Sequence, residues 1–140
     1  MRHGDTLEVR IERLGPKGVG LVSIEARVGP DGASSTYALH VRKAFPGERV
    51  RVMVEGGRRR KLPARVLEVI EPSPDRIEPR CPHYGWREVP GKGCGGCTLQ
   101  AMDYRGQLHV KHGLIKEVLG RADVDPSVIA EPIGAEEPWY

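Results

Sequence analysis

The sequence is poor in aromatic residues and cysteines, and it lacks any long apolar run. One Phe, two Trp, four Tyr and three Cys occur among its 140 residues. No apolar stretch approaches the roughly 18 residues that a membrane span needs. The first residues, MRHGDTLEVRIERLG, also lack the apolar segment of a secretory signal. We therefore expect a cytoplasmic protein that has no membrane partner.

Several catalytic patterns are missing as well. The chain has no H-E-x-x-H motif, no readable Ser/His/Asp set and no pattern of paired carboxylates. We therefore predict no catalytic residue and no small-molecule cofactor site. An odd number of cysteines without an export signal argues against a disulfide scaffold and favours a cytosolic metal or cluster site.

Glycine and proline are abundant, with 18 and 12 residues, which is typical of short strands joined by many turns. Five segments suggest strands: 6–15, 15–25, 36–45, 46–57 and 63–72. Alternation predicts the buried faces Leu7, Val9 and Ile11, then Tyr37, Leu39 and Val41, then Val50, Val52 and Val54. Residues 1–72 are thus predicted to form a small five-stranded β-barrel.

The second half of the chain has a different pattern. Three prolines in EPSPDRIEP, residues 71–79, predict an extended linker at 73–80. Residues 81–140 then form a second unit, which opens with a cysteine-rich loop. Apolar residues near helical intervals predict a helix within 98–121, with Thr98 as its N-cap. The predicted fold class is α+β.

The two halves also differ in charge. Residues 1–72 carry 14 Lys and Arg against 9 Asp and Glu, whereas residues 73–140 carry 8 against 10. The first half, with its excess of five positive charges, is the half expected to attract a polyanion.

RNA contacts are predicted on the loop GGRRRKLP and at the end of the strand 36–45. The predicted RNA-binding residues are Arg42, Lys43, Arg58, Arg59, Arg60 and Lys61, supported by outward positions of Arg10, Arg49 and Arg51. The alternative for the loop is a solvated run of charge that deters edge pairing. Tyr37 and His40 either stack on bases or pack within the barrel.

The cysteines carry the sharpest signal. Cys94 and Cys97 form a C-x-x-C pair around two glycines, and Cys81 precedes them by thirteen positions. Such a pair places two sulfurs within reach of one metal or cluster, and thiolates prefer soft metals or iron–sulfur clusters. Zinc with His83 as the fourth ligand is equally compatible with the spacing. Spacing alone does not separate zinc from iron.

The order of barrel, CPHYG, CGGCTLQ and YRGQLHVKHGLI resembles the N-terminal part of the RNA uracil-C5 methyltransferase family. The resemblance implies a TRAM domain, an OB-like barrel that binds RNA, followed by a segment that carries a [4Fe-4S] cluster. It implies that Cys81, Cys94 and Cys97 are cluster ligands. S-adenosylmethionine would bind only to a C-terminal domain of the full-length enzyme.

Two features depart from the family pattern. The family usually has five residues between its first two cluster cysteines, whereas this chain has twelve. The fourth cluster cysteine and the catalytic nucleophile lie further along in the family. We therefore expect a monomeric front portion of such an enzyme, with an incomplete ligand set, that binds RNA (ribosomal RNA by expectation) and is inactive alone. The alternative is a stand-alone RNA-binding module with a structural zinc.

Overall fold

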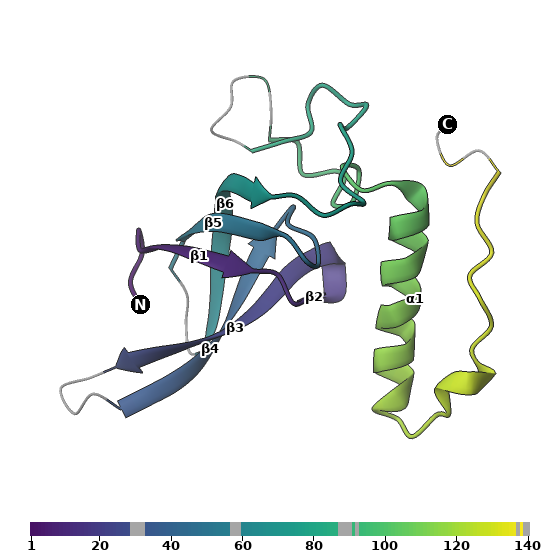
Figure 1. The fold of residues 1–140 in the computed structure, drawn as a ribbon, viewed down its shortest axis with the longest axis horizontal. Helices are drawn as coiled ribbons and strands as arrows, with labels where there is room; N and C mark the ends of the chain where they lie inside the picture. Colours follow the sequence, from purple (N-terminus) through teal and green to yellow (C-terminus); the bar gives the residue numbers. More distant parts are fainter. Residues whose placement is uncertain (29–32, 57–59, 87–90, 92, 137, 139–140) are drawn as a thin grey trace.

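The computed structural model describes residues 1–28, 33–56, 60–86, 91, 93–136 and 138, and it shows a curled sheet beside one long helix (Figure 1). The strands are β1 (Thr6–Arg10), β2 (Arg13–Leu14), β3 (Val19–Val28), β4 (Ala33–Arg42), β5 (Arg49–Val54) and β6 (Lys61–Glu71). The helices are the 3-10 turns η1 (Pro16–Gly18) and η2 (Pro126–Val128) and the α-helix α1 (Tyr104–Gly120). No helix in this described part is long and apolar enough to cross a membrane.

The sheet curls because its two outermost strands are consecutive in the chain. The strand order is β1-β5-β6-β4-β3-β2, antiparallel except between β4 and β6. Only Ile11 and Glu12 separate β1 from β2, so the two ends of this order must lie together. The amide of Ile11 donates to Glu48 at 2.9 Å, and that of Glu12 to Leu21 at 2.9 Å. The chain thus bends from one sheet edge to the other.

The interior of the curled sheet confirms the predicted alternation. Its core includes Val9, Ile11, Leu39, Val41, Val50, Val52 and Val54, and Leu7 and Tyr37 are partly buried against it. Tyr37 therefore packs against this core, which is one of the two roles predicted for it. The described sheet has six strands rather than five, because the stretch predicted as one strand at 6–15 divides into β1 and β2.

The predicted helix exists, but it begins later than expected. Asp103, rather than Thr98, is the N-cap of α1, because its carboxylate accepts a hydrogen bond from the amide of Gly106 at 2.7 Å. The helix is also less buried than its pattern suggested. Gly106 and His112 are its buried residues, while the side chains of Ile115 and Val118 remain about half exposed.

Residues 73–80, the predicted linker, are hydrogen-bonded on two sides. The amide of Ser73 donates to the carboxylate of Glu48 at 3.2 Å, and the amide of Ile77 donates to Ala101 at 2.9 Å. Arg76 also pairs with Met102 in an isolated β-bridge. The extended backbone is therefore fixed between the sheet and the segment that leads into α1.

Glu48 is the anchor of this arrangement, because its side chain is fully buried. One carboxylate oxygen accepts from the amide of Phe45 at 2.9 Å and from Arg76 Nη2 at 2.9 Å. The other accepts from Ser73 and from Arg76 Nε. The guanidinium also lies 4.5 Å from the centre of the Phe45 ring. A buried carboxylate is tolerated when it is paired and hydrogen-bonded, as here.

We predict that Glu48→Ala lowers the free energy of unfolding by roughly 3–5 kcal/mol, because it leaves the Arg76 guanidinium without its buried partner. Urea denaturation measures the loss. The control is Glu71→Ala, which removes an exposed carboxylate that pairs with Arg10 and Arg49 and should change stability little. Equal effects from the two variants would show that the buried pair has no special weight.

Candidate functional site

The three cysteines are free thiols in different surroundings. Cys81 is partly buried and packs against a small cluster of Phe45, Tyr84, Ala101 and Met102. Cys94 and Cys97 are exposed on the glycine-rich loop. The three thiols that the resemblance assigns to one [4Fe-4S] cluster thus differ in exposure. Cys81 packs against the apolar side chains around Phe45, whereas Cys94 and Cys97 are exposed to solvent.

Gln100 links two of the cysteines. Its side chain is only 7% exposed. Its carbonyl oxygen accepts from the amide of Cys81 at 2.9 Å, and its amide nitrogen donates to Cys97 Sγ at 3.5 Å. Sequence reasoning missed this role, although Gln100 falls inside the quoted segment CGGCTLQ. Gln100 therefore fixes the backbone of one predicted ligand and the sulfur of another.

The described residues do not form a closed metal site. Within this part of the chain, no group of three His, Cys, Asp or Glu side chains is arranged to hold a metal ion. His83 Nδ1 lies 3.2 Å from the carbonyl oxygen of Gly91, and the His83 carbonyl accepts from the amide of Cys94 at 3.0 Å. The three sulfurs suit a soft metal or an iron–sulfur group by their chemistry. The metal-binding assignment of Cys81, Cys94 and Cys97 stays a prediction.

Lys43 ties the curled sheet to the cysteine loop. Its ammonium donates to the carbonyl oxygen of Gly85 and, at 3.2 Å, to that of Cys94. It also lies 4.6 Å from the centre of the Tyr84 ring. Burial lowers the pKa of Lys43, and the nearby Cys94 offsets part of this shift by raising it. This lysine, predicted to contact RNA, uses its ammonium within the protein.

Tyr84 also contacts the cysteine loop. Burial raises the pKa of Tyr84 to about 12, so its hydroxyl is neutral at physiological pH. The hydroxyl donates to the carbonyl oxygen of Thr98 at 3.1 Å. Thr98 in turn packs against the turn η1, where a Cβ on Gly18 would come within 2.9 Å of Thr98 Oγ1. The loop therefore contacts the sheet at Lys43 and at Gly18, among other described residues.

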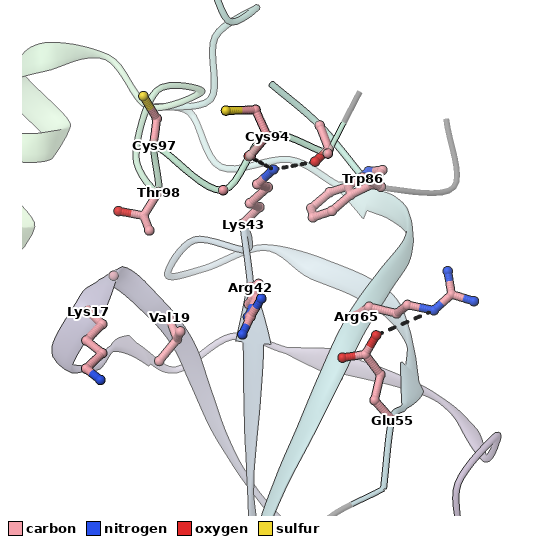
Figure 2. Close-up of a pocket in the computed structure, with 14 residues that line it drawn as sticks. Lys17, Val19, Arg42, Lys43, Glu55, Arg65, Trp86, Cys94, Cys97 and Thr98 are labelled. Atoms are coloured by element: carbon pink, nitrogen blue, oxygen red, sulfur yellow. Dashed lines mark hydrogen bonds and ion pairs between the residues drawn. The ribbon is translucent and has the colours of Figure 1, made fainter. Parts of the chain in front are cut away.

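A groove of about 370 Å³ runs between the cysteine loop and the edge of the sheet. Figure 2 shows Lys17 and Arg42 on the sheet side and Cys94, Cys97 and Trp86 on the loop side. The charged lining residues are Lys17, Arg42, Lys43, Arg65 and Glu55. Of these, Arg65 and Glu55 face each other at 3.9 Å. The described part of the groove thus has four cationic residues and one carboxylate.

The arginines of the β1-β5-β6 face have a different environment. Arg10 pairs with Glu71 at 2.5 Å, Arg49 with Glu71 at 3.0 Å, and Arg51 with Glu8 at 2.8 Å and Glu68 at 2.5 Å. These exposed pairs neutralise most of the charge that the sequence assigned to outward positions. Their expected support for RNA binding is weakened accordingly.

The other predicted RNA-contacting residues are spread over the sheet. Arg58 and Arg59 lie outside the described residues. Arg60 and Lys61 are exposed at the start of β6, and Arg42 is exposed at the end of β4. Lys17, Arg65 and Trp86, which the sequence did not single out, line a groove together with Arg42.

The known proteins that this chain resembles are named as RNA methyltransferases. No protein-family model matches the chain. An uncharacterized RNA methyltransferase of Halalkalibacterium halodurans is 38% identical over 136 residues, which is 96% of this chain and 26% of the relative. The chain is therefore similar along almost its whole length to part of an RNA methyltransferase.

Two further relatives have a specific name, 23S rRNA (uracil(1939)-C(5))-methyltransferase RlmD. The one from Alkalilimnicola ehrlichii is 33% identical over 96% of this chain and 26% of its own length. The one from Vibrio cholerae is 27% identical over 94% of this chain and 26% of its own length. These matches confirm the resemblance to RNA uracil-C5 methyltransferases. The chain spans about a quarter of the length of the relatives that it matches.

We predict that Lys43→Met loosens the cysteine loop, because it removes two charge-assisted hydrogen bonds that hold the loop to the sheet. Hydrogen exchange at the amides of Tyr84 and Cys94 should accelerate about tenfold. Lys17→Met, which removes a cation from the same groove, should leave these amides unchanged. Unchanged exchange in Lys43→Met would mean that the loop is held by its own packing.

Proposed function

We propose that the chain is the RNA-binding and cluster-binding front portion of an S-adenosylmethionine-dependent RNA uracil-C5 methyltransferase that acts on ribosomal RNA. The observation that carries this proposal is the similarity of 94–96% of the chain to enzymes named as RNA methyltransferases. S-adenosylmethionine binding and methyl transfer belong to the remainder of such an enzyme. In this proposal the protein acts in the cytoplasm, where its thiols stay reduced.

The curled sheet is the RNA-binding part in this proposal, as an OB-like TRAM barrel. OB-like barrels bind nucleic acid on the outer surface of the sheet and on the loops that border it. The cations that are available for this task are those without a carboxylate neighbour, such as Lys17 and Arg42 in the described structure. Binding through such cations is mainly electrostatic, so it should weaken steeply with salt.

The cysteine loop is the cluster-binding part. Cys81, Cys94 and Cys97 supply three thiolates to a [4Fe-4S] cluster, and the fourth ligand comes from outside this set of three. When bound, the cluster supplies a rigid cross-link for a loop that is rich in glycine. Gln100 supports the proposal, because it already holds the Cys81 backbone and the Cys97 sulfur.

We predict that anaerobic reconstitution gives a coloured protein with about four irons and that Cys81→Ser, Cys94→Ser and Cys97→Ser each retain less iron. Gln100→Leu should also retain less, because Cys97 loses its N–H donor. Iron analysis and visible absorbance measure retention. His83→Ala is the control and should bind iron as the parent chain does. Binding of about one zinc that His83→Ala abolishes would instead identify the alternative, a structural zinc site.

We predict that removing the metal loosens residues 81–100 and leaves the sheet intact. The core of the sheet contains no cysteine, whereas the smaller cluster around Phe45 and Tyr84 includes Cys81. Hydrogen exchange of the reconstituted and chelator-treated protein measures this. Amides of β5 should exchange at the same rate in both, and those of Tyr84 and Cys94 should exchange faster after chelation. Equal acceleration in β5 would contradict the separation of the two cores.

A further inference from the structure

We propose that the groove between the sheet edge and the cysteine loop is a binding site for single-stranded RNA, with a base against Trp86 and the backbone phosphates at Arg42 and Lys17. The inference rests on the proposed RNA-binding function and assigns that function to one place. The groove lies between two parts of the chain, so neither the sheet nor the loop forms it alone (Figure 2).

The groove carries positive charge. Lys17 and Arg42 are exposed, and within the described residues neither has an ion-pair partner. Among the described residues that line the groove, the one carboxylate is Glu55, which lies 3.9 Å from Arg65. Arginines on the β1-β5-β6 face are matched by Glu8, Glu68 and Glu71. The described surface therefore leaves positive charge uncompensated in the groove, where a phosphate backbone would find it.

The aromatic ring is the second argument. Trp86 lines the groove and is partly buried, packed against the core of the sheet. The Lys43 ammonium lies 5.9 Å from its ring centre, so core packing and a nearby cation both restrain the ring. A ring fixed in this way is a preorganised surface for a base. Stacking of a base on an aromatic ring suits any sequence, because every base has a π-face.

The shape of the groove is the third argument. Its volume of about 370 Å³ is at the lower end of the range for ligand pockets, and it is partly open to solvent. One wall is the turn η1, which approaches Thr98 through Gly18, and the other carries Cys94 and Trp86. A duplex keeps its base faces stacked inside, whereas a single strand can present a base to a ring and phosphates to cations at once. The combination therefore favours single-stranded RNA.

The experiment measures binding of a fluorescent oligouridine to the reconstituted chain across a salt series. Arg42→Gln should weaken binding about three- to tenfold and reduce the slope of log affinity against log salt by about 0.7, the value for one single-strand phosphate contact. Arg51→Gln is the matched control, because it removes the same charge from the β1-β5-β6 face. It should leave both affinity and slope close to those of the parent chain.

Trp86 needs a separate readout, because its ring packs against the core. Trp86→Leu should weaken binding about 5- to 100-fold without changing the salt slope, and Trp86→Tyr should restore most of the affinity. Thermal unfolding checks that both variants are folded. In a Trp139→Phe background, oligouridine should quench the remaining tryptophan fluorescence. Uridine monophosphate and inorganic phosphate should compete only weakly, because each offers one contact.

Several outcomes would overturn the assignment. If Arg42→Gln and Arg51→Gln weaken binding equally, RNA binds by diffuse attraction and the groove is not its site. If duplex RNA or an acidic peptide competed as well as single-stranded oligouridine, stacking of a base on the Trp86 ring would have no part in binding. If the parent chain binds RNA and both Arg42→Gln and Trp86→Leu bind as well as it does, the groove assignment fails while the proposed function stands. If the parent chain binds no RNA, both fail.

Discussion

The buried pair of Glu48 and Arg76 is the interaction on which the arrangement of the molecule depends. It joins the turn before β5 to the extended segment that follows β6. Arg76 also donates to the carbonyl oxygen of Lys43 at 3.0 Å, and the Lys43 side chain then holds the cysteine loop at Gly85 and Cys94. One continuous series of polar contacts thus runs from the sheet to the predicted metal ligands.

The pair also joins the two halves of the chain where they meet. Desolvation of a carboxylate and a guanidinium costs several kcal/mol, which is offset only when both groups are hydrogen-bonded. Glu48 meets this condition by accepting from two backbone amides as well as from Arg76. Those amides belong to Phe45 and Ser73, on either side of β5 and β6. The segment expected to be a linker therefore supplies some of the hydrogen bonds that stabilise the buried pair.

Most of the sheet could be predicted from the sequence because its signal is local. Alternation within six to ten residues identifies the buried faces of Val50, Val52 and Val54, which are all fully buried. The burial of Glu48 could not be predicted, since two of its partners, Ser73 and Arg76, lie more than twenty residues away in the sequence. The helix start was predicted wrongly at Thr98. Asp103 is the N-cap, because its carboxylate accepts from the amide of Gly106.

The groove was beyond local patterns, because it brings together Lys17, Arg42, Trp86 and Cys94 from four separate stretches. Net charge was a poor guide to it. The excess of positive charge in residues 1–72 is spread over the sequence, but the fold surrounds Arg10, Arg49 and Arg51 with glutamates and leaves Arg42 without one among the described residues. Attraction for a polyanion is set by the charge that remains after such pairing. Because Cys94 and Cys97 also line this groove, binding of a metal or cluster there would alter the electrostatic field at Arg42, and the two proposed binding functions would share one wall.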